Sequence, residues 1–224
     1  MDANATNCQD IPSGTNYCDE VTLTSVVGLI ASSLSIAFVW PQVLRVYAKR
    51  STEGVVPESF LQGSCGSLLW TIYGFGLGNL SLIIANVQIV IASALILMVC
   101  VRHEKIALWK PVVAHFATLV LGLFALSISV NLLGFVTVAV GTPAIIWQVV
   151  RVYRTEHLYG VSVMTYGLLF ACTIAWFIYG ALIGDWFVAA PNIIGVSGSL
   201  YICIRVVRSH QKFKVPDEPL METI

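Results

Sequence analysis

Two tryptophans and two asparagines recur at one spacing, with each Trp nine residues before a polar turn and each Asn seven residues after it. They are Trp70 and Asn86 around Asn79, and Trp176 and Asn192 around Asp185. In a helical hairpin this spacing places all four side chains ~10–14 Å from the turn, at about 1.5 Å per residue. An indole offers an apolar plane to a ring face rich in C–H groups, and a carboxamide both donates and accepts hydrogen bonds. The set predicts a binding site for a neutral polyhydroxylated solute.

A structural role is the alternative for each of these residues. Trp in membrane proteins commonly anchors a helix at the interface, and Asn inside a span can bond to a neighbouring helix. The depth of the four positions and their duplication favour the binding interpretation.

The duplication extends over most of the chain. The run from Gln42 to Tyr47 returns between Gln148 and Tyr153, at an offset of 106 residues, and the same offset maps Gly74 onto Gly180. Between positions 42 and 90, 14 of 49 pairs are identical. Self-similarity at a fixed offset indicates an internal repeat, and any account of the fold must accommodate two copies of one unit.

The composition is that of an integral membrane protein. Of 224 residues, 57% are hydrophobic and 11% are charged. Several uncharged stretches reach about 18 residues, the length needed to cross roughly 30 Å of hydrocarbon. A lipid bilayer is therefore the expected surrounding. No basic face with interleaved aromatics points to nucleic acid.

Seven spans are predicted. The uncharged stretch Pro111–Val150 is 40 residues long, which is two crossings with a turn near Asn131. The spans are Thr24–Leu44, Pro57–Leu77, Leu80–Val101, Pro111–Val130, Leu132–Val150, Val161–Ile183 and Trp186–Val207.

All basic residues fall on one side of these spans. The 12 Lys and Arg lie between spans one and two, between three and four, after span five, and at or beyond the end of span seven. By the positive-inside rule, the N-terminus is outside and the C-terminus is cytoplasmic, most simply in the cell membrane.

An odd number of crossings in each repeat requires one additional helix to keep the two copies parallel. The predicted fold is therefore all-α, with two parallel three-helix repeats in a 3+1+3 arrangement, as known in transporters. The expected divisions are an extracellular segment at 1–22, a first repeat at 23–103, a linker helix at 104–131, a second repeat at 132–208 and a cytoplasmic tail at 209–224.

Four motifs carry a family resemblance: Trp40-Pro41-Gln42, the Trp70–Gly74 run, its counterpart Trp176–Gly180, and Pro191–Gly195 after Asp185. Together they make the chain resemble the SWEET and PQ-loop transporter superfamily from Gly28 to Arg208. The resemblance implies a facilitative sugar transporter that works by alternating access between two three-helix bundles. It also implies that Asn86, Asn192 and Trp176 line the sugar pocket.

One position departs from the plant members of this family. They usually hold a small residue where this chain has Trp70, whereas the half-size bacterial relatives, which dimerise, place Trp on both sides. The resemblance therefore implies a narrower pocket and a monosaccharide substrate.

The same resemblance assigns hinges and an outer gate. Intramembrane prolines permit rocking in the family, which makes Pro41, Pro57 and Pro143 candidate hinges, with a static kink as the alternative. The counterpart of Pro57 is Val163. The outer-gate candidates lie near the outer helix ends, and both glycines among them are expected to allow close helix approach. They are Tyr73, Gly74, Tyr179, Gly180 and Asp185.

The absence of charged residues from the middle of the predicted spans, and of metal and catalytic motifs, narrows the functions that the sequence allows. No Asp, Glu, Lys or Arg occupies the middle third of any predicted span, and such residues usually mark ion coupling, so uniport is predicted. No metal, cofactor or enzymatic nucleophile–base motif is found, and His115 is interpreted as an interfacial residue. The alternatives are a PQ-loop transporter of amino acids or another small metabolite, and a seven-helix receptor or scaffold. A homo-oligomer and a Cys8–Cys18 disulfide are left open, as is glycosylation at Asn4 and Asn79.

Overall fold

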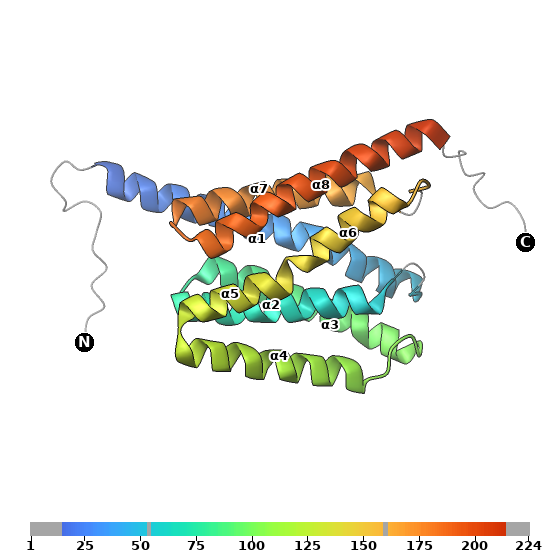
Figure 1. The fold of residues 1–224 in the computed structure, drawn as a ribbon, viewed down its shortest axis with the longest axis horizontal. Coiled ribbons are helices and arrows are strands. Elements are labelled where there is room, and N and C mark those ends of the chain that lie inside the picture. The colour runs from blue at the N-terminus through green and yellow to red at the C-terminus, as the bar shows by residue number, and fades with distance from the viewer. Residues whose placement is uncertain (1–14, 53–54, 159–160, 214–224) are drawn as a thin grey trace, which may run out of the picture.

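The computed structural model describes residues 15–52, 55–158 and 161–213. Side chains are described from residue 23 onwards. The described part is helical and forms an elongated bundle in which the helices run nearly parallel to one axis (Figure 1). Its eight helices are α1 (Thr15–Lys49), α2 (Pro57–Leu77), α3 (Leu80–Arg102), α4 (Trp109–Ile128), α5 (Val130–Gly141), α6 (Pro143–Arg154), α7 (Val163–Leu182) and α8 (Trp186–Phe213).

The predicted fifth span corresponds to two helices, α5 and α6. Pro143 begins α6, and Thr142 between them keeps helical dihedrals of φ −68° and ψ −35°. Because proline has no N–H to donate to the preceding turn, the chain changes direction here without leaving the helical path. Figure 1 shows α6 inclined away from α5. Pro41, by contrast, lies inside an unbroken α1.

Six described helical segments are long and apolar enough to cross a membrane, with α5 and α6 counted together. The seventh is α2, which has 21 residues but carries Gln62, Ser64 and Ser67. These polar side chains lie inside the protein rather than against lipid: Ser64 bonds to α4, and the other two line a cavity between the repeats. Burial within the bundle explains why α2 needs less hydrophobic surface than its neighbours.

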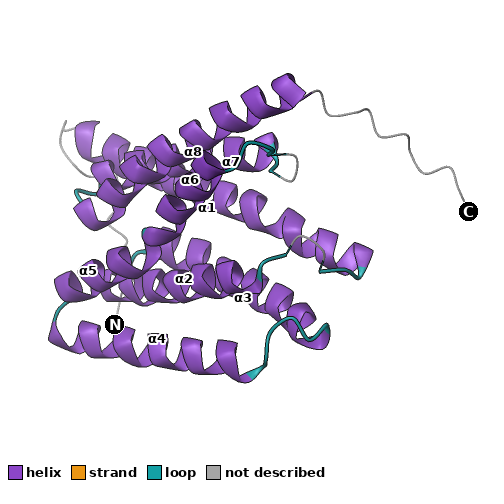
Figure 2. Ribbon diagram, turned by 45° about the vertical axis from the view of Figure 1, so that its right-hand side comes forward, coloured by secondary structure: helices purple, strands orange, loops and turns teal. Residues whose placement is uncertain are grey.

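The two repeats pack by the same rule. In the first repeat, α1 and α2 both pack on α3; in the second, α6 and α7 both pack on α8. Between the repeats, α1 packs on α7 and α2 packs on α5, which are equivalent contacts under the 106-residue offset. The linker α4 packs on α2 and α5 at the edge of the bundle (Figure 2).

Close approach within each hairpin depends on a glycine. A Cβ atom on Gly180 would lie 2.6 Å from the backbone nitrogen of Ala189, and one on Gly74 would lie 3.0 Å from Ile83 Cγ1. The glycines thus bring α7 against α8 and α2 against α3, as the sequence predicted.

Burial divides the bundle into a shared end and a split end. We call the end with Asn79 and Asp185 the hairpin end, and the end with Arg102 and Arg208 the basic end. At the hairpin end a single apolar cluster combines both repeats, with Tyr73, Leu82, Tyr179 and Val188 among its members. At the basic end there are two separate clusters: one contains Val46, Ile96 and Cys100 of the first repeat, and the other contains Val152, Ile202 and Val206 of the second.

Several helix ends differ from the ends of the predicted spans. Helix α1 begins at Thr15 rather than Thr24, and α8 continues to Phe213 rather than Val207. The turn after α4 falls at Ser129, whose hydroxyl accepts a hydrogen bond from the amide of Leu132. His115 has partners within the bundle: its Nε2 lies 2.7 Å from Ser64 Oγ and its Nδ1 lies 2.7 Å from the carbonyl oxygen of Pro111. Its interfacial position stays a prediction.

Candidate functional site

A cavity of about 280 Å³ lies between the two repeats, and all four predicted binding residues line it. Trp70 comes from α2, Asn86 from α3, Trp176 from α7 and Asn192 from α8. The remaining lining residues also come from both repeats: Gln62, Gly63, Gly66, Ser67, Leu82, Gly141, Thr142, Ala144, Ile145, Leu169, Thr173, Val188, Pro191 and Gly195. The spacing in the sequence therefore correctly predicted that these four side chains lie around one cavity.

The two asparagines hold the same conformation. Nδ2 of Asn86 donates to the carbonyl of Leu82 at 2.8 Å, and Nδ2 of Asn192 donates to the carbonyl of Val188 at 2.7 Å. Each bond fixes the carboxamide against its own helix. Neither Oδ1 has a hydrogen-bond partner in the part of the chain that the structure describes. Each repeat therefore contributes to the cavity lining one asparagine whose carbonyl oxygen and second amide hydrogen remain available for hydrogen bonds.

The two tryptophans are held differently. Nε1 of Trp176 donates to Ser35 Oγ of α1 at 3.1 Å, and Ser35 in turn donates to the carbonyl of Ala31 at 2.9 Å. Trp70 faces Gly141 of α5, the position equivalent to Ser35, and Nε1 of Trp70 would lie 3.5 Å from a Cβ atom built there. No hydroxyl is available at that point. Trp70 is correspondingly half-buried, whereas Trp176 is 9% exposed.

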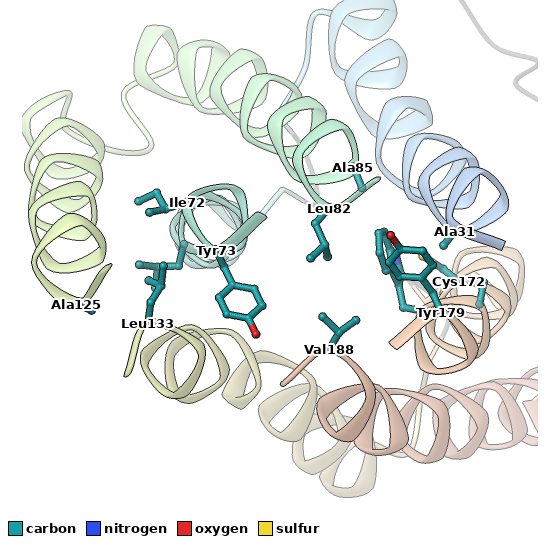
Figure 3. Packing of buried hydrophobic residues seen from close by; sticks show 13 residues of the cluster. Ala31, Ile72, Tyr73, Leu82, Ala85, Ala125, Leu133, Cys172, Tyr179 and Val188 are labelled. Carbon is teal, nitrogen blue, oxygen red and sulfur yellow. The ribbon is translucent and has the colours of Figure 1, made fainter. Parts of the chain in front are cut away.

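The cavity is closed at the hairpin end by an apolar layer. Leu82 and Val188, which are equivalent residues, are each 2% exposed and line the cavity. Figure 3 shows their side chains pointing toward each other between Tyr73 and Tyr179. This layer separates the cavity from the turns of both hairpins.

Two hydrogen bonds join the repeats beyond this layer. The Tyr73 hydroxyl donates to Asp185 Oδ2 and the Tyr179 hydroxyl donates to Asn79 Oδ1, each at 2.9 Å. The acceptors are equivalent residues, so the two bonds exchange under the pseudo-twofold axis. Each acceptor also caps its own helix: Asn79 Oδ1 accepts from the amide of Leu82, and Asp185 Oδ1 accepts from the amide of Phe187. Asn79 was not among the gate residues predicted from sequence.

The cavity extends from the two tryptophans toward the basic end. From Trp70 the lining follows α2 to Gln62, and from Trp176 it follows α7 to Leu169, both in the direction of the basic end. The apolar clusters are separate there. The cavity thus lies beneath a shared, hydrogen-bonded closure and extends between two independently packed halves.

Comparison with known proteins gives a consistent family. The profile of the PQ loop repeat matches residues 23–83. The chain is 30% identical over 200 residues to the bidirectional sugar transporter SWEET12 of rice, Oryza sativa subsp. japonica, covering 79% of this chain and 64% of that protein. It is also 31% identical over 65 residues to the sugar transporter SemiSWEET of Leptospira biflexa, covering 29% of this chain and 76% of that protein. The chain belongs to the SWEET family of PQ-loop repeat proteins.

A solved eukaryotic SWEET transporter has the same fold. The match covers 84% of this chain and 99% of that structure, with a TM-score of 0.69 and 15% identity. The predicted seven-helix 3+1+3 architecture is thereby confirmed. The chain spans slightly less than two thirds of the length of the rice SWEET relative.

Several other predicted roles have a defined place in this SWEET fold. Pro57 begins α2 and is buried, and Val163 begins α7 at the equivalent position. Pro41 is exposed on α1, and Pro143 marks the change in direction between α5 and α6. Their action as hinges stays a prediction. The sequon at Asn4 and the cysteine at position 8 lie outside the described residues, as does the side chain of Cys18.

Proposed function

We propose that this protein is a facilitative transporter of small neutral sugars. The observation that carries the proposal is the pair of preorganised asparagine carbonyls, one from each repeat, facing a cavity that two indoles also line. Sugar hydroxyls need such acceptors and donors once water is removed, and sugar rings stack on apolar planes. The names of the rice and Leptospira relatives, both sugar transporters, point to the same substrate class.

We expect alternating access because the two ends of the bundle are packed differently. Opening the hairpin end requires breaking two hydrogen bonds and separating Leu82 from Val188. The separate clusters at the basic end let each repeat move as a unit, because each keeps its own core. Rocking about the central site would then expose it to one side at a time, as in other transporters built from repeats.

Three finer properties belong to the proposal. The solute is a monosaccharide, since indoles on both sides narrow the site. Transport is uniport, since the middle third of each described helix contains no Asp, Glu, Lys or Arg that could couple to an ion. The hairpin end faces outward from the cell membrane and the basic end faces the cytoplasm, in accordance with the positions of Lys and Arg.

The decisive experiment removes one carboxamide at a time. In proteoliposomes, Asn86→Ala and Asn192→Ala should each lower monosaccharide uptake by about ten-fold or more, because an unpaired sugar hydroxyl costs about 1–3 kcal/mol. Asn131→Ala, on the exposed side of α5, is the matched control and should leave uptake unchanged. Melting temperatures of all three variants should stay near that of the parent protein. A parallel loss of stability and uptake would assign both asparagines to helix packing instead.

The same vesicles test substrate and energetics. Trp70→Ser should shift selectivity toward disaccharides, because it widens one side of the cavity. Uptake should end at equal concentrations and ignore an imposed pH gradient. Accumulation driven by protons would overturn uniport, and uptake of amino acids in place of sugars would overturn the substrate assignment.

A further inference from the structure

A second cavity, of about 530 Å³, lies on the outside of the bundle between α3 and α4. It exists because α4 packs on α2 and α5 and not along α3, which leaves a groove beside the linker helix. Its walls include Ala94 and Met98 of α3 and Val112 of α4, all of which are exposed. The sugar site is elsewhere, between the repeats, so this groove has no part in the function proposed above.

One end of the groove is charged. Arg102, the last residue of α3, lines it at the basic end, and its guanidinium is exposed with no ion-pair partner in the described ranges. Around it, from the end of α3 to the start of α4, Lys105 and Lys110 outnumber the one acid, Glu104. A groove with an apolar length and a cationic mouth has the polarity of a phospholipid with an anionic headgroup, because an acyl chain fits the walls and a phosphate pairs with Arg.

The wall of the groove also differs from an ordinary lipid-facing helix surface. His115 lines it and is fixed through its Nε2 to Ser64 Oγ of α2, at 2.7 Å. The groove therefore has side walls from two helices and a rigid connection to a third. An acyl chain inside it would contact protein on several sides, whereas a lipid on a convex helix surface contacts protein on one side only.

We propose that the α3–α4 groove binds one anionic phospholipid, with an acyl chain between Ala94 and Val112 and the phosphate on Arg102. The internal repeat provides a matched comparison. Arg208 and Leu200 of α8 are equivalent to Arg102 and Ala94, and both are exposed. However, the linker α4 has no second copy, so α8 has no such helix beside it. The second repeat therefore has the equivalent arginine at the equivalent helix position, but it has no equivalent groove.

The test compares lipids of equal chain length added to the purified full-length protein in detergent. Phosphatidylglycerol should raise the melting temperature more than phosphatidylcholine does, and native mass spectrometry should retain one phosphatidylglycerol per chain. The preference should be about five-fold or more, which corresponds to ~1 kcal/mol per interfacial charge. Inorganic phosphate should leave the melting temperature unchanged; a rise would assign Arg102 to a soluble anion and overturn the lipid site.

Two pairs of variants locate the lipid. Arg102→Gln should abolish the preference for phosphatidylglycerol, and Arg208→Gln should keep it. Ala94→Trp should fill the groove and release the retained lipid, whereas Leu200→Trp should not. Melting temperatures in phosphatidylcholine show whether all four variants are folded. Equal effects of the α3 and α8 variants, or retention of the lipid by Ala94→Trp, would overturn the proposal.

Discussion

Trp70 and Trp176 occupy equivalent positions in the two repeats, yet only one indole is fixed. Trp176 donates its N–H to Ser35, whereas Trp70 faces Gly141 and its N–H has no hydrogen-bond partner among the described residues. In the repeat that follows the linker, the indole that lines the cavity is therefore held by a hydrogen bond. In the repeat that precedes it, the indole is not held in this way and has a spare donor. Duplication reproduced the residue types at the site, and divergence at one supporting position made their roles unequal.

The same inequality is found at the hairpin end. Asp185 carries a charge where Asn79 does not, although both accept a tyrosine hydroxyl at 2.9 Å. It is found again in the hairpins, where the contact at Gly180 is with backbone and the nearest contact at Gly74 is with a side chain. Each difference predicts unequal results from equivalent substitutions.

The largest difference between equivalent substitutions is expected at Gly74 and Gly180, in the free energy of unfolding. Gly180→Ala should destabilise the protein by about 1–3 kcal/mol, since its methyl group would press on the backbone of Ala189. Gly74→Ala should be nearly neutral, because about 1 kcal/mol of helix propensity offsets a milder contact with Ile83. Thermal unfolding in detergent measures both. Gly167→Ala, where nothing lies within 4 Å of the added Cβ, controls for the helix effect. Equal losses at Gly74 and Gly180 would contradict the packing difference.

The next largest difference is expected for Tyr73 and Tyr179, whose hydrogen bonds close the hairpin end. Tyr73→Phe removes a hydrogen bond to a charged group, worth about 1.5–3 kcal/mol, and Tyr179→Phe removes a neutral one, worth about 0.5–1.5 kcal/mol. Opening at the hairpin end should rise by about ten-fold or more in the first variant and by a few-fold in the second.

A cysteine introduced at Ser67, which lines the cavity, reports this opening through its reaction rate with a membrane-impermeant thiol reagent added at the hairpin end. The native cysteines are replaced in this background. Tyr153→Phe, on an exposed tyrosine of α6, should leave the rate unchanged. If the two closure variants react at the same rate, the charge on Asp185 makes no difference to the closure.

The smallest effects concern the supports of the two indoles. Ser35→Ala should weaken sugar binding by a few-fold, because the loss of a neutral hydrogen bond of about 0.5–1.5 kcal/mol frees Trp176 to rotate. Gly141→Ser should also weaken it slightly, since the new hydroxyl competes for the N–H of Trp70. Isothermal titration with the transported sugar measures both, and Ser33→Ala on the exposed side of α1 is the control. Tighter binding by Gly141→Ser would show that a free Trp70 is a disadvantage.

The sequence was sufficient for the fold and for the membership of the site, for identifiable reasons. Apolar span lengths and the 106-residue offset determine the number and relation of the helices, and the spacing of Trp70 and Asn86 from the turn determines their depth. Depth plus pseudo-symmetry places the four residues together without knowledge of any contact. Asn79 could also have been found in this way, because the offset maps it onto Asp185.

Other features depend on helix rotation, which spacing does not determine. Ser35 was not predicted as a support for Trp176 because several hydroxyls follow one another in α1, and only packing decides which one faces α7. The bond between His115 and Ser64 depends likewise on how α4 lies against α2. Separate packing at the basic end is a property of three-dimensional contacts that no local pattern in the sequence records.

The double role of Asn79 and Asp185 affects how easily each of the two closing hydrogen bonds can break. When the Tyr179 phenol leaves, Asn79 Oδ1 still accepts from the amide of Leu82. When the Tyr73 phenol leaves, Asp185 Oδ2 loses its partner, because the amide of Phe187 bonds to the other oxygen, Oδ1. Opening therefore costs one hydrogen bond on each side, and only on the Asn79 side does the released oxygen keep a partner. Since each 1.4 kcal/mol changes a rate about ten-fold, the second partner of Asn79 Oδ1 should make the Tyr179 bond the faster of the two to open.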